Sequence, residues 1–443
     1  MTALTQSLVD LVCRGAPPAD AWLHLGERAA VDTVGVLLTG AADPAVEIVA
    51  GTLDEEGGPV RSLSTGRMLA ARSAALVDGT AAHALDFDDV DDALIAHPSA
   101  VLVPALLAAG QNPDVTGAAI LDAYALGLLA GRIVAGALGV TGHYALGWHS
   151  TGTIGTVAAT AAIARLQQLD DDAVRRALGV AGSLAAGSRQ NFGTMTKPLH
   201  AGTAAAHGIL AARLAAGGFT SDPQQMDGPL GFLALHSDGP SGVTADPELP
   251  IAVNVKLFPC CYATHSAAEA ALALSREVDD PRALTEIEVA VPGGGLAPLV
   301  HHRPVTGAQA KFSMEYVVAE ALLRGRLGLA SFAEDRVGAR DVQDLLPQVR
   351  AREEPGADVA AVGSFARVTA RDADGREHVA AVDRPLGHAS RPVDEAALEA
   401  KFADCAPAAD PRLFHDLRRL RDRPSVAELA SRIALAAATG AGR

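Results

Sequence analysis

Aromatic residues are scarce in this chain: two Trp, four Tyr and ten Phe make up only 4% of 443 residues. A core with so few rings must be built from Ala, Leu and Val. Hydrophobic residues make up 49% of the chain, which is ample for a large core. At this length, two or three domains are expected rather than one.

Positive charge is also scarce. The chain carries 36 Lys and Arg residues against 52 Asp and Glu, a formal net charge of −16. Nucleic acids and anionic membranes bind basic surfaces, so neither is expected as a partner. A small anionic substrate stays possible, because a few lysines suffice for a local positive pocket.

Four cysteines are present, and they form neither a CxxC pair nor a Cys/His metal spacing. Reduced thiols in a cytoplasmic protein are therefore expected. Cys260 or Cys261 could act as a nucleophile, but inert buried thiols are the favoured interpretation. The opening residues lack the basic region of a signal peptide. The most apolar stretch, 120–140, contains Asp122 and Arg132 and predicts a buried helix rather than a membrane span.

Helical spacing of apolar residues dominates the first half of the chain. It predicts an all-α region with helices at about 4–14, 21–38, 43–54, 68–86, 98–110, 115–139, 152–166, 170–186 and 199–217. After about residue 255, strand patterns enter at 285–293 and as a hairpin with an Asp-Gly turn at 365–382. Helical patterns at 264–276 and 312–324 lie between them. The tail from about Asp394 is helical again. We therefore expect a helical domain made of 1–255 and 394–443, and an α+β domain at 256–393.

Several common catalytic motifs are missing. No GxGxxG follows a predicted strand, and no GxxxxGK[ST], HExxH or GxSxG occurs. Nucleotide-binding, zinc-protease and serine-hydrolase functions therefore have no basis in the sequence.

The stretch LDFDDVDDALIAHPSA, 85–100, carries five carboxylates in seven residues. One interpretation is a magnesium–diphosphate site of a terpenoid enzyme using Asp88, Asp89 and Asp92. That site needs a second ligand cluster, which we do not find, and a cavity lined with aromatic rings. The other interpretation is a proton-transfer site with Asp86 and His97, in which Asp91 and Asp92 are surface residues or loop caps.

Four further residues stand in suggestive surroundings. His149 precedes an Ala-rich helix with good N-cap residues, and a helix start favours an anion. Lys197 and Lys256 each stand alone in an uncharged run, which indicates either a lysine reaching solvent or one paired with a carboxylate. Tyr316 lies on a helical pattern and is equally compatible with a core tyrosine. His200 and His207 are interpreted as packing histidines.

Together these segments resemble the MmgE/PrpD family, which includes 2-methylcitrate dehydratase, cis-aconitate decarboxylase and iminodisuccinate epimerase. The resemblance rests on HALDFDD followed by HPSA, GWHSTGTIG, FGTMTKPLHAG, KLFPCCYATH and FSMEY, in this order. It implies a mainly α fold, with a large helical domain from both chain ends and a smaller α+β lid domain, in a homodimer. It also implies chemistry on small di- or tricarboxylates without a metal or other cofactor.

The resemblance assigns roles residue by residue. His97 matches the main proton donor or acceptor. His149, Lys197 and Lys256 match residues that stabilise substrate carboxylates during catalysis, and Asp86 and Tyr316 match substrate-binding positions. Proton transfer next to a carboxylate needs cationic groups where enolate charge develops and a group that titrates near neutrality.

The expected activity is therefore that of a cofactor-independent lyase, with dehydration of the 2-methylcitrate type placed first. Decarboxylation and epimerisation are the alternatives within the family. A magnesium-dependent terpenoid enzyme and a non-catalytic binding relative are the alternatives outside it.

The chain also departs from the family pattern. Val90 and Asp91 replace the Thr and His of a common DFDDTH run, and the linker to His97 is about one residue longer. Ser266 stands where many bacterial members have Arg. Each change removes a polar or cationic group, so we expect a substrate with fewer or differently placed carboxylates than methylcitrate.

Overall fold

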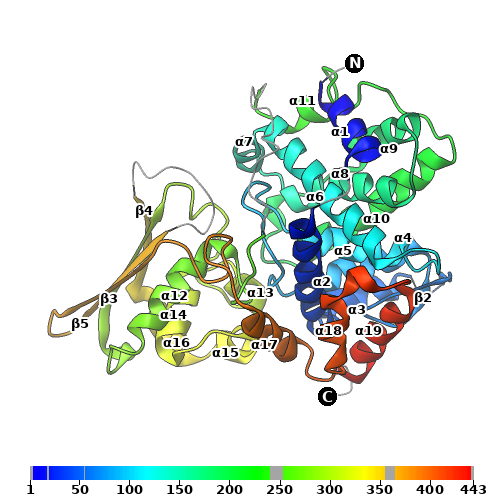
Figure 1. Ribbon diagram of the computed structural model, residues 1–443. Coiled ribbons are helices and arrows are strands. Elements are labelled where there is room, and N and C mark those ends of the chain that lie inside the picture. The colour runs from blue at the N-terminus through cyan, green and yellow to red at the C-terminus, as the bar shows by residue number, and fades with distance from the viewer. Residues whose placement is uncertain (1–2, 17–18, 54, 240–252, 355–364, 441–443) are drawn as a thin grey trace. The chain divides into compact units, whose positions relative to one another are not determined.

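The computed structural model describes residues 3–16, 19–53, 55–239, 253–354 and 365–440 (Figure 1). The chain divides into two compact units. Unit 1 comprises 1–190, 197–253 and 394–443, and unit 2 comprises 191–196 and 254–393. Unit 1 is thus built from both ends of the chain. The predicted domain division stays a prediction: one domain made of 1–255 and 394–443, and a second made of 256–393.

Unit 1 is helical apart from a two-stranded ladder of β1 (Val60–Arg61) and β2 (Met68–Leu69). Its helices are α1 (Ala3–Arg14), α2 (Asp20–Gly40), α3 (Pro44–Gly51), α4 (Ala71–His83), α5 (Pro98–Ala109), α6 (Gly117–Leu138), α7 (Val140–Ala145), α8 (Ser150–Leu166), α9 (Asp171–Leu184), α10 (Thr196–Ala216), α11 (Phe232–His236), α17 (Glu395–Cys405), α18 (Arg412–Arg418) and α19 (Ala427–Gly440). The predicted mainly α class is confirmed.

Helix ends in unit 1 follow local sequence signals. The Thr116 hydroxyl accepts a hydrogen bond from the backbone N–H of Ala119 at the start of α6, and Gly139 ends that helix at φ 66°. The Asp170 carboxylate caps α9 in the same way. By length and hydropathy α6 could cross a membrane, but 72% of its most apolar window is buried inside the protein. This burial favours the predicted core helix.

Unit 2 contains a four-stranded sheet in the order β4-β3-β5-β6, with β3 (Leu284–Pro292), β4 (Val349–Glu354), β5 (Ala366–Asp372) and β6 (Glu377–Val382). The predicted strand and hairpin correspond to β3 and to β5–β6, and Gly375 adopts φ 80° in the turn. The strand β4, which pairs in parallel with β3, was not predicted, because its sequence VRAREE is short and mostly charged.

The helices of unit 2 are α12 (His265–Leu274), α13 (Gly307–Ala310), α14 (Met314–Arg324), α15 (Glu334–Val337) and α16 (Arg340–Leu345). The helix α12 packs against β5 and β6, and α14 packs against β4 (Figure 1). Both helices match predicted ones.

A pair of glycines lets α4 and α10 approach closely in unit 1. A Cβ atom on Gly79 would lie 2.8 Å from the Cα of Gly202, and one on Gly202 would lie 2.2 Å from the Leu76 carbonyl oxygen. Any larger side chain would force the helices apart. This contact matters because α4 ends at His83 and Lys197 lies in the first turn of α10.

The C-terminal helix α17 supports the loop that follows α4. Its Lys401 ammonium lies 2.6 Å from the Asp32 carboxylate of α2 and donates a 2.9 Å hydrogen bond to the Phe87 carbonyl. The ammonium also lies 4.1 Å from the centre of the Phe87 ring. All of these groups are buried, so the Lys401 ammonium fixes the backbone between Asp86 and Asp88.

We predict that Lys401→Met destabilises the protein by about 3–5 kcal/mol, because it leaves the buried Asp32 without its counter-charge. Urea unfolding followed by circular dichroism measures the loss. Arg419→Met is the matched control: Arg419 pairs with Asp422 at the surface, with 75% of its side chain exposed, and should change stability by less than about 1 kcal/mol. Equal losses in both variants would contradict the anchoring role of Lys401.

Candidate active site

The loop between α4 and α5 carries the acidic stretch and is entirely within unit 1. It starts from His83, the last residue of α4, and ends at His97, which directly precedes Pro98 at the first position of α5. Asp86 has φ 51°, a left-handed conformation that is uncommon outside glycine but tolerated by Asp. The loop folds back so that its two ends meet.

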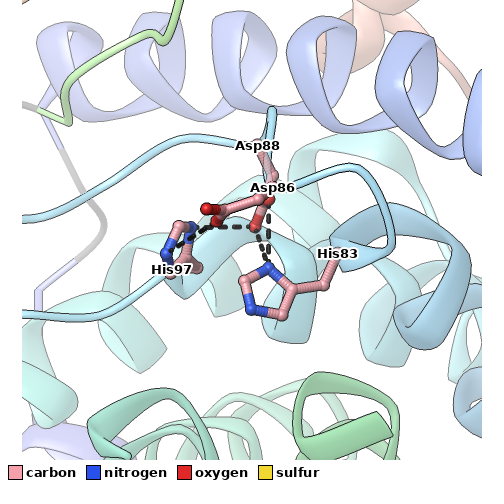
Figure 2. Close-up of side chains that lie close together, drawn as sticks. All are labelled: His83, Asp86, Asp88 and His97. Carbon is pink, nitrogen blue, oxygen red and sulfur yellow. Dashed lines mark hydrogen bonds and ion pairs between the residues drawn. The ribbon is translucent and has the colours of Figure 1, made fainter. Parts of the chain in front are cut away.

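The buried Asp88 carboxylate lies between two imidazole rings, as Figure 2 shows. His83 Nδ1 is 2.9 Å and His97 Nδ1 is 3.1 Å from Asp88 Oδ2. The opposite nitrogen of His97, Nε2, is 3.6 Å from Asp86 Oδ1. The backbone N–H of His97 donates to the hydroxyl of Thr151 on α8, at 3.1 Å. Each ring nitrogen of His97 thus faces a carboxylate, and its backbone N–H is hydrogen-bonded.

Lys197 joins this group from α10. Its side chain is only 5% exposed, and its Nζ lies 3.0 Å from Asp86 Oδ1 and 2.7 Å from His83 Nε2. Lys197 therefore does not reach solvent, and its role toward a substrate carboxylate stays a prediction. The five residues form a closed ring of contacts: His97, Asp88, His83, Lys197, Asp86 and back to His97.

His149 lies beside the ring, directly before the first residue of α8. Its ring stacks on that of His83 with 5.8 Å between centroids, and its Nδ1 is 3.0 Å from His200 Nδ1. One of these two nitrogens must carry a proton that the other accepts. His200, interpreted from the sequence as a packing residue, therefore orients His149.

Burial and neighbouring charges shift the pKa values of this group. Burial, reinforced by Lys197, lowers the pKa of His83 to about 3 despite the nearby Asp88. Burial and then Lys197 also hold the pKa of His149 well below its usual range. Burial alone would raise the pKa of Asp88, but the two imidazoles outweigh it and hold that pKa well below the usual range. At neutral pH, His83 and His149 are neutral and Asp88 is charged.

His83, Asp86, Asp88 and His97 could in principle hold a metal ion, since each offers one ligand atom within 4.8 Å of the others. The ammonium of Lys197 already binds Asp86 and His83 Nε2, where it supplies the positive charge that a cation would bring. A divalent ion would have to displace it or share its ligands. The donor set therefore fits a buried lysine better than a metal.

The acidic stretch does not present a row of facing carboxylates. Asp89 accepts hydrogen bonds from the backbone N–H and hydroxyl of Ser99, and burial together with neighbouring acids holds its pKa well above the usual range. Asp91 pairs with Arg132 of α6 at 2.7 Å. Neighbouring acids thus have different partners and opposite pKa shifts, contrary to what a magnesium box requires.

The expectation that Asp91 lies on the surface is wrong, because its side chain is only 1% exposed. Its other predicted role, as a loop cap, is correct: the carboxylate accepts from the backbone N–H groups of Ala93 and Leu94. Asp91 also bridges to Ala96 in the backbone, so the longer linker closes into a tight loop. In this tight loop Ile95 adopts φ 46°, which is a strained conformation for a β-branched residue. This departure from the family pattern thus shapes the loop that delivers His97.

Lys256 and Tyr316 belong to unit 2, and their place at this site stays a prediction. Lys256 is fully buried. Tyr316 is also fully buried, and its hydroxyl donates a hydrogen bond to the Ser331 carbonyl, as a core tyrosine would. Ser266, one of the departures, is buried in the same unit.

Of the predicted residues, the structure brings together Asp86, His97, His149 and Lys197. Sequence reasoning missed His83, Asp88 and His200. His83 and Asp88 stand inside the quoted HALDFDD motif, and His83 ends an Ala-rich helix, so their spacing from Asp86 was available as a signal. His200 lies three residues after Lys197, on the same side of a helix, which was also visible.

Sequence comparison finds relatives that are named cis-aconitate decarboxylase. Among curated sequences, the chain is 29% identical over 353 residues to a cis-aconitate decarboxylase of Homo sapiens, covering 74% of this chain and 71% of that protein. It is 29% identical over 354 residues to the Mus musculus enzyme of that name, covering 74% and 70%. It is 26% identical over 368 residues to one from Aspergillus terreus, covering 75% and 74%.

Two family models match in succession along the chain. The MmgE/PrpD N-terminal domain matches residues 9–243, and the MmgE/PrpD C-terminal domain matches residues 258–413. Together they cover most of the sequence, including the whole ring of contacts around His97. The chain belongs to the MmgE/PrpD family.

Proposed function

We propose that this protein is a lyase that removes CO₂ from a small tricarboxylate of the cis-aconitate type, without a metal or other cofactor. The observation that carries the proposal is His97, held between the buried carboxylates of Asp86 and Asp88 beside the ammonium of Lys197. The names of the relatives support decarboxylation within a family that also dehydrates and epimerises.

In cis-aconitate, one carboxylate sits on a methylene group next to the carbon–carbon double bond. When its bond to that methylene breaks, CO₂ leaves and the electron pair moves through the double bond. Negative charge then develops on a carbon next to another carboxylate, giving an enolate-like anion. One proton must be added there, so each turnover consumes one proton from the protein.

His97 is suited to deliver that proton. Carboxylates on both sides of its ring favour the charged imidazolium, which is the proton-donating form. Asp86 holds both His97 Nε2 and Lys197 Nζ through a single oxygen, so it orients the acid and the cation toward one place. Lys197 then stabilises the enolate charge as it develops, when its interaction counts most.

Dehydration of the 2-methylcitrate type is the second candidate, because the same ring can remove a proton next to a carboxylate. The two reactions need opposite forms of His97. A decarboxylase loses kcat/KM as pH rises and the imidazolium loses its proton, whereas a dehydratase loses it as pH falls and the free base is protonated. The direction of the pH profile between 6 and 9, roughly around the ordinary histidine pKa, therefore separates them.

The charge of the site suggests what else is required. In unit 1, Lys197 faces the two negative charges of Asp86 and Asp88 while His83 and His149 are neutral. A polycarboxylate needs further positive charge to bind. We propose that Lys256 supplies it, as the family resemblance implies, together with Tyr316 as a neutral contact. Assembly as a homodimer and a cytoplasmic location complete the proposal.

We predict that His97→Gln lowers kcat about 10²–10⁴-fold with cis-aconitate, the usual effect of removing a general acid. The folded state should persist, because Gln can still contact Asp88. Product formation followed by proton NMR measures the loss, and circular dichroism checks folding. Full activity in a folded His97→Gln protein would rule out the assigned role.

Lys197→Met should raise KM and lower kcat together, by about 10²-fold in kcat/KM, because the ammonium binds the substrate and binds the transition state more tightly. Lys311→Met is the matched control, since it removes the one lysine that is not buried. Steady-state kinetics of both variants measure the effect. An unchanged Lys197→Met enzyme would remove Lys197 from the mechanism.

Activity should survive excess EDTA, and Asp89→Asn should change kcat/KM by less than about tenfold, because Asp89 is buried against Ser99 and is not part of the ring of contacts. A magnesium site built on the acidic stretch would lose all activity in both tests.

Turnover in D₂O, with cis-aconitate, citrate, 2-methylcitrate and substituted succinates as substrates and proton NMR as the readout, identifies the reaction. Decarboxylation places one deuterium next to a carboxylate of the product, dehydration gives a new vinyl signal from a saturated substrate, and epimerisation labels recovered substrate.

A further inference from the structure

His83 has no role in the proposed mechanism so far, yet it links the two sides of the ring. Its Nδ1 contacts Asp88, and its Nε2 contacts Lys197, at 2.7 Å. The side chain is completely buried, so water cannot replace either contact. Lys197 of α10 therefore reaches the loop by two routes, directly through Asp86 and through His83 to Asp88.

The contacts of His83 determine where its proton sits. A lysine ammonium has only hydrogens to donate, so His83 Nε2 must accept. The proton of the neutral ring is then on Nδ1, where it is donated to Asp88. A second proton on Nε2 would point at the ammonium of Lys197, and the depressed pKa of His83 agrees with this exclusion.

The same reasoning continues to His97. The charged Asp88 carboxylate accepts a hydrogen bond from His83 Nδ1, and it can accept a further one from the side where His97 Nδ1 lies. A carboxylate fixed beside one imidazole nitrogen keeps the proton there, as an orienting aspartate does in hydrolase triads. The Asp88 contact of His97 is the shorter one, at 3.1 Å against 3.6 Å for Asp86, whose oxygen also accepts from Lys197. This difference favours a proton on Nδ1 of His97 and leaves Nε2, on the Asp86 side, to gain and lose one.

We propose that His83 is a positioning residue that sets the tautomer of His97 through Asp88 and the orientation of the Lys197 ammonium by direct contact. The inference rests on the proposed function, in which His97 is the proton donor. In this proposal the neutral His83 ring helps to keep one proton fixed on Nδ1 of His97. The proton that is delivered to the substrate then comes from Nε2.

Several charged or titratable groups surround His97 and bear on its pH dependence. Asp86 and Asp88 face its two nitrogens, and the ring of His83 lies 4.4 Å from its own between centroids. Lys197 approaches from α10 and His149 from the start of α8. Because Asp86, Asp88 and Lys197 all bear on the charge of His97, a test of His83 must leave these three residues in place.

Two substitutions of His83 separate its two contacts. In His83→Asn the amide nitrogen takes the place of Nδ1, so the donor to Asp88 is kept and the acceptor for Lys197 is lost. In His83→Gln the amide oxygen takes the place of Nε2, so the acceptor is kept and the donor is lost. Each variant is therefore the control for the other.

We expect His83→Asn to raise KM, because Lys197 then keeps only its contact with Asp86, with an unchanged limb in the pH profile of kcat/KM. We expect His83→Gln to move that limb upward by about one pH unit, because the unshared charge of Asp88 stabilises the imidazolium of His97. Identical effects of the two variants on KM and on the limb would overturn the inference.

Nuclear magnetic resonance of the wild-type protein tests the proposal without any variant or substrate. The chain has only four lysines, so ¹⁵N-lysine labelling gives a simple spectrum in which Lys197 is assigned by its absence from Lys197→Met. A slowly exchanging Lys197 ammonium coupled to a neutral His83 is expected, with protons on Nδ1 of both His83 and His97 in ¹⁵N-histidine spectra. A His83 that titrates near 6.5, or a neutral His97 protonated on Nε2, would overturn the proposal.

The outcomes keep the inference apart from the proposed function. If His97→Gln stays fully active while the wild-type spectra show the expected tautomers, the proposed function fails and the hydrogen-bond arrangement stands. If His97→Gln is inactive but the tautomers differ, the lyase proposal stands and His83 loses its positioning role.

Discussion

The burial of Lys197 is the constraint on which the site depends. A lysine ammonium is rarely found inside a protein unless it is paired, because removing it from water is costly. Here Asp86 and His83 provide its partners, and each is itself held in place: Asp86 by a left-handed backbone, His83 by the end of α4 and by Asp88. The glycine contact between α4 and α10 brings these groups within hydrogen-bonding distance. The contacts of Lys197 with Asp86 and His83 therefore depend on how α4 and α10 pack along their lengths.

The far end of the chain contributes to the same loop. Lys401 extends from α17 to Asp32 and to the Phe87 carbonyl, between the two acids that flank His97. Asp91 and Arg132 fasten the other end of the loop to α6. The chain contains only four lysines among 36 basic residues, and three of them, Lys197, Lys256 and Lys401, are buried. Three of the four lysines thus occupy buried sites, where a compact, single-point charge fits.

Much of this arrangement could be predicted from the sequence. The helices of unit 1 have a clear apolar spacing and strong end signals, and Asp86, His97, His149 and Lys197 stand in unusual local surroundings. The strand β4 could not be predicted, because its partner β3 lies far away in sequence and its own residues are charged. Asp91 was misplaced for a similar reason: an acid in a row of acids reads as exposed, and only the approach of Arg132 from another helix makes its burial possible. The functional weight of His83 was hidden because alanine-rich surroundings indicate a packing histidine, and its partners come from two different elements.

Two neighbouring carboxylates illustrate how the fold gives one sequence motif two electrostatic roles. Asp88 faces two imidazoles, which hold its pKa well below the usual range, whereas burial and other acids hold the pKa of Asp89 well above it. Successive side chains of a loop point in different directions, so one enters the ring and the next enters the core. A string of acids that would chelate a metal if all pointed one way instead divides its members between proton transfer and packing. For the same reason, the charge available to a substrate in unit 1 is set by Asp86, Asp88 and Lys197 alone. The sum of these charges is negative before His97 is protonated. Protonation of His97 and binding of a polyanion should therefore favour each other, and a reaction that consumes a proton requires this coupling.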